Sequence, residues 1–309
     1  MLARGTGILA KAIADHTAVP AFATYNLEMV QAVVAAAEQT GQPVIMLAGS
    51  SHFHHAGRTT LISIALQAAH DSTATIGVHL DHCRALAEIE QCVKAGYSSV
   101  MVDGSHLPFE DNIELTRAAV ALAHPAGTWV EAELGAVPGD EDVSTDAAPA
   151  QTMTDPREAA EFVERTGVDA LAVAVGNVHG LTTTPVPLDL DRLAAIKAAV
   201  PVPLILHGAS GLPDQQLGEA IRRGVAKINI NTELRQAYLA AMQSALAAVL
   251  SIHESVALWR AGREAVTTAA VRSIHALSAT SWATLSELDL GPDPAANRAA
   301  TSPDRHLRR

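Results

Sequence analysis

Short apolar runs alternate along this chain with longer, alanine-rich segments of helical periodicity, and the alternation repeats eight times. A strand, a helix and a further strand form the unit of a parallel sheet, because the helix carries the chain back to the start of the next strand. Eight such units within about 230 residues close a parallel (β/α)8 barrel. We therefore expect an α/β fold of the TIM-barrel type. A doubly wound sheet is the alternative, but no G-x-G-x-x-G follows the first expected strand.

The expected elements follow from the position of each run. The strands are predicted at Val19–Ala23, Pro43–Ala48, Thr75–Leu80, Ser98–Val102, Thr128–Ala132, Ala170–Val175, Pro203–Leu206 and Ala226–Ile230. The helices are predicted at Leu27–Thr40, Arg58–His70, Arg84–Ala95, Glu110–Ala123, Pro156–Thr166, Asp189–Ala199, Pro213–Arg223 and Thr232–Leu250.

Two segments depart from the alternation. Leu134–Met153 shows no periodicity, and a loop of that length in a compact domain is usually a lid or disordered. Beyond a barrel of about residues 1–250, a helical pattern returns, and we expect an extra C-terminal helical arm over about 251–288. Barrel and arm together would make one catalytic domain, 1–288, while 289–309 is rich in Pro, Ala, Asp and Arg and predicts a disordered tail.

Composition narrows the classes of partner. The net charge is −12, from 21 Lys+Arg against 33 Asp+Glu, which disfavours nucleic acid as a partner. No run of about 18 apolar residues predicts a membrane span, and the first twenty residues lack a signal-type apolar stretch. Two cysteines form no disulfide framework. We expect a cytoplasmic protein that does not bind membranes.

Polar side chains gather where the expected strands end. Active sites of these barrels lie at the carboxyl ends of the strands, so residues at six such ends would meet at one mouth. The opposite ends, such as Gln42-Pro43, carry nothing comparable. The six ends are His79–His82, Asp103–His106, Glu131–Glu133, Gly176–Gly180, His207–Gly211 and Asn229–Thr232.

Three histidines, His82, His179 and His207, lie at the ends of three different strands. Three neutral imidazoles supply the nitrogens of a catalytic zinc and leave its fourth position open. A single histidine or aspartate after a strand is more often an ordinary polar residue or a helix cap, so the prediction depends on the joint pattern. We predict one divalent ion, zinc, bound by these three side chains.

Several segments, in this order, make the chain similar to the class II, metal-dependent fructose-bisphosphate and tagatose-bisphosphate aldolases over roughly residues 1–250. They are VPAFATYNLE (19–28), GVHLDHC (77–83), SVMVDGSHLPFEDNI (99–113), VEAELG (130–135), AVGNVHGL (174–181), LILHGASGL (204–212) and KININTELR (227–235).

The resemblance implies roles for four carboxylates. Asp81 resembles the acid–base residue that protonates the aldehyde oxygen during condensation and removes that proton during cleavage. Asp103 and Glu133 resemble a second, alternative position of the metal ion. Glu141 resembles the residue that exchanges the proton on the ketose carbon.

The resemblance also implies a substrate site, a further cation and an assembly. Carbonyl groups of Val178, Gly180 and Gly208 would hold a monovalent cation, Na⁺ or K⁺, and the chain would form a homodimer or homotetramer. The residues that resemble the dihydroxyacetone-phosphate site are Gly180, Gly208, Ala209, Ser210, Asn229, Ile230, Asn231 and Thr232. Loops before a helix N-terminus are the usual phosphate cradle of these barrels.

The implied reaction is reversible cleavage of a ketose 1,6-bisphosphate, fructose or tagatose, to dihydroxyacetone phosphate and an aldehyde such as glyceraldehyde 3-phosphate. Departures from the family at Ala23, Ser50–Phe53 and Cys83 surround the expected aldehyde half and leave the aldehyde open. Two alternatives remain at this point. One is a Schiff-base aldolase that uses Lys227, and the other is a catalytically idle barrel that acts as a partner or regulatory subunit.

Overall fold

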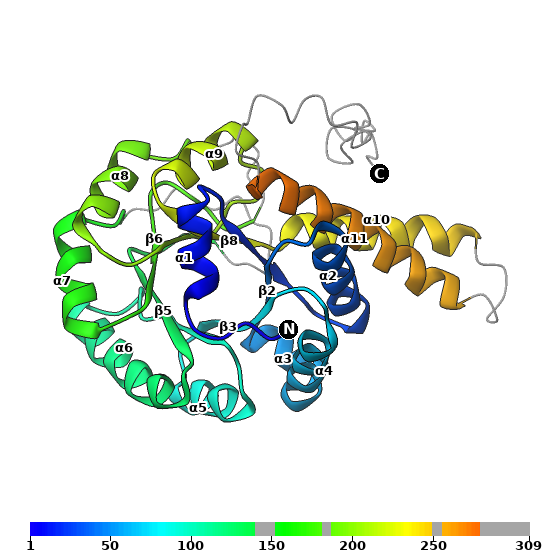
Figure 1. Ribbon diagram of the computed structural model, residues 1–309, viewed down its shortest axis with the longest axis horizontal. Helices are drawn as coiled ribbons and strands as arrows, with labels where there is room; N and C mark the ends of the chain where they lie inside the picture. The colour runs from blue at the N-terminus through cyan, green and yellow to red at the C-terminus, as the bar shows by residue number, and fades with distance from the viewer. Residues whose placement is uncertain (140–151, 181–186, 249–254, 279–309) are drawn as a thin grey trace, which may run out of the picture.

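The computed structural model describes residues 1–139, 152–180, 187–248 and 255–278. Eight parallel strands form a closed barrel in chain order, with the first paired to the last, so the predicted TIM barrel is confirmed (Figure 1). The strands are β1 (Val19–Ala23), β2 (Val44–Gly49), β3 (Ile76–Cys83), β4 (Ser99–Val102), β5 (Trp129–Leu134), β6 (Ala170–Val173), β7 (Leu204–Leu206) and β8 (Val225–Ile230).

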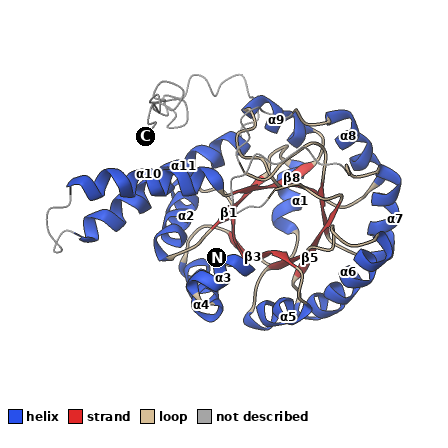
Figure 2. Cartoon of the chain, turned by 180° about the vertical axis from the view of Figure 1, so that it is seen from behind, coloured by secondary structure: helices blue, strands red, loops and turns tan. Residues whose placement is uncertain are grey.

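Helices surround this barrel (Figure 2). Those expected from periodicity are α2 (Leu27–Thr40), α4 (Arg58–Asp71), α5 (Leu86–Ala95), α6 (Phe109–Ala123), α7 (Pro156–Thr166), α8 (Leu190–Ala199), α9 (Asp214–Arg222), α10 (Thr232–Ala248) and α11 (Ser255–Ser278). Three short elements were not expected: α1 (Gly7–Ala14), α3 (Ser50–Ala56) and the 3-10 helix η1 (His124–Ala126).

Local signals fix several helix ends. The side chain of Asn26 accepts a hydrogen bond from the backbone N–H of Met29 at 2.9 Å and caps the start of α2. Asp155 caps α7 in the same way, with proline at the first helical position. Gly41 ends α2 with a left-handed backbone, φ +65°, which glycine adopts without strain.

The barrel has two apolar cores. The larger lies between the strands and the surrounding helices, and the smaller fills the barrel interior below the mouth, where the strands end. Leu9 and Ala12 of α1 join Val19, Trp129 and Ala226 in the inner core, so α1 closes the end where the strands begin. With that end filled by apolar side chains, the polar residues of the interior are confined to the opposite end.

The expected C-terminal arm is present as α11, and α10, which the sequence predicts as the eighth barrel helix, extends with it. Helices α10 and α11 pack against each other and project from one side of the barrel (Figures 1 and 2). Helix α11 also packs against α2 and β1, and buries Val266, Ala270 and Ile274. It is therefore part of the barrel wall as well as of the arm. Within the described residues, no helix combines the length and apolar character needed to cross a membrane.

Candidate metal centre and active site

A bulge in β3 points two consecutive side chains into the mouth. Leu80 pairs with Val100 and Cys83 with Val102, so β3 contains one more residue than β4 over this stretch. Side chains of a regular strand alternate between its two faces, and an extra residue re-aims them. His82 at the bulge has a left-handed backbone, φ +42°, an uncommon conformation for a residue other than glycine. The bulge lets Asp81 and His82 both face the interior.

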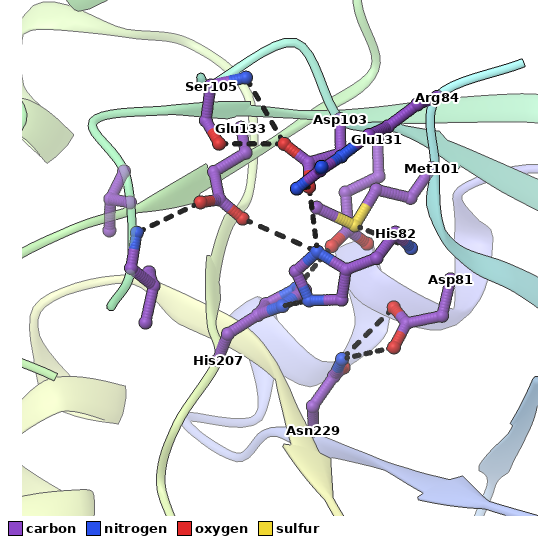
Figure 3. Close-up of polar contacts among 12 residues, drawn as sticks. Asp81, His82, Arg84, Met101, Asp103, Ser105, Glu131, Glu133, His207 and Asn229 are labelled. Carbon is purple, nitrogen blue, oxygen red and sulfur yellow. Dashed lines mark hydrogen bonds and ion pairs between the residues drawn. The ribbon is translucent and has the colours of Figure 1, made fainter. Parts of the chain in front are cut away.

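The three predicted histidines lie together. His82, His179 and His207 each offer a ring nitrogen, and these atoms lie within 4.8 Å of one another. His82 Nε2 and His207 Nδ1 are 2.8 Å apart (Figure 3). The rings of His82 and His179 meet edge to face with centroids 5.1 Å apart. The residues come from the ends of β3, β6 and β7, as the strand pattern predicts.

His82 also faces two carboxylates. Its Nδ1 lies 3.3 Å from Asp103 Oδ2 and 3.9 Å from Glu133 Oε2, and the three residues form a second group with metal-ligand spacing. Ser105 donates to Asp103 through its hydroxyl at 2.7 Å. The guanidinium of Arg84 lies 3.5 Å from the same carboxylate, on a side chain that is 63% exposed.

A second polar layer lies deeper in the barrel. Glu131 accepts from His207 Nε2 at 2.8 Å and from Lys227 Nζ at 2.8 Å, and all three side chains are fully buried. His79 stacks on Trp129 and places its Nε2 3.7 Å from both Asp81 and Glu131. Lys227 therefore contacts a carboxylate below the histidines, and its full burial does not suit the Schiff-base alternative.

Burial and neighbouring charges set the protonation states. Burial lowers the pKa of His179 and of His207, which keeps both rings neutral. Burial opposes the charged form of His82, but Asp81 and Asp103 overcome it and raise the pKa of His82 to about 10. Burial, offset only in part by His82, raises the pKa of Glu133 to about 7. Glu133 is thus the carboxylate of the mouth that the neighbouring positive charges stabilise least.

These residues fit a divalent cation. Glu133 Oε2 is buried and accepts no hydrogen bond from the described part of the chain. Four carboxylates, Asp81, Asp103, Glu131 and Glu133, are buried, whereas Lys227 is the one buried lysine among the described residues. A cation at the histidines would replace the proton that His82 holds and would balance the charge of the carboxylates.

Asp81 is held by the opposite wall of the barrel. The side-chain amide of Asn229, on β8, donates to both Asp81 oxygens, at 3.1 and 3.3 Å. Burial raises the pKa of Asp81, but the positive charge of His82, together with that of Lys227, outweighs it, and the carboxyl stays ionised with a lowered pKa. Two predicted residues, Asp81 and Asn229, are therefore in direct contact beside the three histidines.

The loops after β7 and β8 also meet. Ser210 donates its hydroxyl hydrogen to Glu233 at 2.8 Å, which joins the Gly208–Ser210 loop to the first turn of α10. Gly208 has φ +58°, and a Cβ there would lie 2.5 Å from the carbonyl carbon and oxygen of Val178. Ala209, Ile230, Asn231 and Thr232 are buried around this junction, and Gly180 is buried at the end of the described segment 152–180. Glu141 lies outside the described residues.

The loop after β2 contains a contact that the sequence did not suggest. His52 of α3 stacks on Tyr25 with ring centroids 4.0 Å apart, and the Tyr25 hydroxyl donates to Asn231 at 3.0 Å. Cys83, by contrast, lies in the outer core and contacts Glu88 of α5. The interpretation of Cys83 as part of the aldehyde half is therefore wrong, because the residue after the bulge faces outward.

The family model described as "Fructose-bisphosphate aldolase class-II" matches residues 3–281. The chain belongs to the class-II fructose-bisphosphate aldolase family. Members of this family are generally metal-dependent, typically with zinc, and the assignment supports a carbon–carbon lyase of the aldolase type. The expected family resemblance is thereby confirmed.

Solved structures similar to this class II aldolase agree with the assignment. The YdjI aldolase from Escherichia coli K12 is 37% identical, with a TM-score of 0.80 over 90% of this chain and 97% of that one. A putative fructose-1,6-biphosphate aldolase from Coccidioides immitis is 33% identical, with a TM-score of 0.80 over 89% and 96%. The fructose-bisphosphate aldolase of Campylobacter jejuni, 22% identical with a TM-score of 0.77 over 89% and 95%, shows the shared fold.

Sequence reasoning missed the deeper layer of this aldolase. The sequence places Glu131 at an expected strand end with no predicted role, and it offers Lys227 a role only in the Schiff-base alternative. The usable signal is the two-residue spacing along each strand: Glu131 precedes Glu133, and Lys227 precedes Asn229, so each pair faces the same side of its strand. That spacing predicts two stacked polar layers, but it does not predict which side chains across the barrel touch.

Gly208→Ala tests how tightly the two loops fit. The added Cβ meets backbone atoms of Val178, which cannot rotate away, so we expect weaker zinc binding and a lower midpoint of thermal unfolding. Gly41→Ala is the matched control, because Gly41 has a similar φ of +65° and nothing within 4 Å of an added Cβ. The control should lose only about 1–2 kcal/mol of stability from backbone strain. Equal effects of the two changes on zinc binding and on the midpoint would contradict the close fit.

Proposed function

We propose that this aldolase is zinc-dependent and reversibly cleaves a ketose 1,6-bisphosphate, fructose or tagatose, to dihydroxyacetone phosphate and an aldehyde such as glyceraldehyde 3-phosphate. The observation that carries the proposal is the meeting of three histidine nitrogens, within 4.8 Å of one another, beside the Asp81–Asn229 pair. A metal site with an adjacent acid–base group is what metal-assisted aldol chemistry requires.

His82, His179 and His207 would hold the ion, and Asp103 and Glu133 would provide the alternative position next to His82. Bound there, zinc supplies Lewis-acid polarisation of the ketose carbonyl and stabilises the negative charge that develops on its oxygen. The three histidines hold their donor nitrogens toward one point, because their rings come from three different strands of a rigid barrel.

Asp81 is proposed to move the proton at the aldehyde oxygen. Its carboxylate accepts both contacts from the Asn229 amide, which fixes its orientation and leaves it ionised for proton removal during cleavage. Glu141 is proposed for the other proton, on the ketose carbon. The described chain nearest to it ends at Gly139, one residue after Pro138, whose carbonyl accepts from the His179 backbone at 2.9 Å.

Backbone N–H groups are proposed to hold the phosphate of the three-carbon donor. The Gly208–Ser210 loop and Asn229–Thr232 approach each other at the first turn of α10, and the N–H groups and dipole of a helix N-terminus favour an anion. Gly180 would line the same site. The proposed monovalent cation, Na⁺ or K⁺, would use carbonyl groups of Val178, Gly180 and Gly208.

Removal of the metal tests the central proposal. EDTA should abolish cleavage of fructose and tagatose 1,6-bisphosphates, and zinc should restore it. His207→Ala should lose most bound zinc and nearly all activity. His124→Ala, at an exposed histidine paired with Asp169 at 2.8 Å, is the control and should keep both. Full activity of a zinc-free His207→Ala protein, measured with metal analysis of the same sample, would reject the proposal.

Asp81→Asn separates acid–base chemistry from metal binding. The amide keeps the size of the carboxyl group but accepts a proton poorly, so turnover should fall by about 10²–10⁴-fold. Zinc content, measured by metal analysis, should not change, because Asp81 is not one of the proposed ligands. A variant that keeps wild-type turnover would remove Asp81 from the acid–base role.

Ser210→Ala tests the phosphate site. Its hydroxyl would donate to the phosphate in place of Glu233, and loss of a hydrogen bond to a charged group costs about 1.5–3 kcal/mol. The KM for phosphorylated donors should therefore rise several-fold or more, with zinc content unchanged. Unphosphorylated dihydroxyacetone serves as the control substrate. If its KM rises equally, the Gly208–Ser210 loop does not bind phosphate.

A homodimer or homotetramer stays a prediction, as does the cytoplasmic location. The arm carries the exposed apolar side chains Leu239, Leu246, Val256 and Trp259, which supports an assembly through α10 and α11.

A further inference from the structure

A buried chain of contacts runs from one proposed zinc ligand across the barrel. His207 on β7 contacts Glu131 on β5, and Glu131 contacts Lys227 on β8, each at 2.8 Å. None of the three side chains has any exposed surface. Strands β5 and β8 are not neighbours in the barrel, so the Glu131–Lys227 pair bridges its interior below the mouth.

Glu131 determines which ring nitrogen of His207 carries the hydrogen and which one keeps its lone pair. An ionised carboxylate only accepts hydrogen bonds, so the 2.8 Å contact with Glu131 Oε1 requires a hydrogen on His207 Nε2. A neutral imidazole then has its lone pair on Nδ1, the nitrogen that faces His82 Nε2 at 2.8 Å. Nδ1 is also the atom through which His207 can join the cluster of three histidines.

Lys227 fixes the carboxylate itself. Its ammonium group binds Glu131 Oε2, the oxygen that His207 does not use, so both oxygens are held and the group cannot rotate. A buried carboxylate without a cation is strongly unfavourable, and Lys227 supplies that cation from within the chain. The pair thus places a fixed acceptor below His207 and is itself balanced in charge.

We propose that Glu131 and Lys227 are positioning residues that hold His207 in its Nε2–H tautomer and thereby set the affinity of the site for zinc. The inference rests on the proposed function in one respect, that His207 is a metal ligand. Neither residue is proposed to touch the substrate. Partners that orient a metal-binding histidine through its second nitrogen typically change metal affinity 10–100-fold when removed.

Two double variants separate the acceptor from the charge. Glu131→Met with Lys227→Met removes both charges and the acceptor, whereas Glu131→Gln with Lys227→Met removes both charges and keeps an amide oxygen that can accept from His207. Both leave an uncharged pair of similar volume at these two positions. The measurement is the zinc dissociation constant, by competition with a chromogenic chelator, with thermal unfolding to show that each variant is folded.

The Glu131→Met/Lys227→Met variant should bind zinc 10–100-fold more weakly than the wild type, and the Glu131→Gln/Lys227→Met variant should recover a large part of that loss. A merely structural or charge-balancing role would affect the two neutral variants equally. Ser99→Ala is the control, because Ser99 is buried in the same barrel but contacts His79 at 2.7 Å instead of His207. Its zinc affinity should stay within about twofold of the wild-type value.

Three results would overturn the inference. One is a folded Glu131→Met/Lys227→Met variant that binds zinc within twofold of the wild type, and another is equal loss in both double variants. The third needs no variant: ¹⁵N NMR of the histidine rings in the metal-free wild type should show His207 protonated at Nε2, and the opposite tautomer contradicts the proposal. His207→Ala, measured by the same zinc competition, separates the failure of this inference from the failure of the proposed function. Unchanged zinc binding in that variant would reject His207 as a ligand, and the positioning role with it.

Discussion

The pairing of β1 with β8 is the interaction on which the site depends. Val19 pairs with Lys227 and Phe22 with Ile230, and this closes eight strands into a ring whose carboxyl ends share one mouth. Asp81 meets Asn229 across 148 residues of sequence, and His82 meets His207 across 125. Those contacts involve side chains from strands that do not neighbour one another. In an open sheet with the same order, β3 and β8 would lie far apart and the site would not exist.

Charge inside the ring is balanced differently at two depths. In the deeper layer, the chain provides its own cation, Lys227, for the carboxylate of Glu131. In the upper layer, His82 pairs with Asp103, while burial raises the pKa of Glu133 to about 7. A buried carboxylate without a full partner is costly, and it persists where a ligand completes the site. The upper layer is thus arranged for an added cation, and the lower layer supports it.

Sequence patterns were sufficient to predict the barrel, because strands and helices have different periods and because few folds accommodate eight alternating strand–helix units. They were insufficient for the short elements. Helix α1 has no side-chain hydrogen bond at its start, and α3 has only seven residues, SSHFHHA, of modest helix propensity. The position of a helix that plugs a barrel or caps a strand is decided by tertiary packing, which local sequence does not contain.

The same limit applies to the directions of individual side chains in the site. The three histidines were predictable, because strand ends of a parallel barrel always meet. The β3 bulge was not, since one extra residue changes which face each side chain takes without changing the residue types. The bulge points Asp81 and His82 inward together, and it sends Cys83 outward to Glu88. A departure from the family at Cys83 therefore concerns packing of α5.

The departure in the loop after β2 has a different meaning. His52 accepts from the Gly49 backbone at 3.2 Å and stacks on Tyr25, which in turn donates to Asn231 beside the proposed phosphate site. The guanidinium of Arg235 lies over the Tyr25 ring, 5.7 Å from its centroid. Since these side chains follow β1, β2 and β8, they form one wall of the mouth. Unlike Cys83, His52 is therefore a departure from the family that connects, through Tyr25, to the residues proposed for the phosphate site.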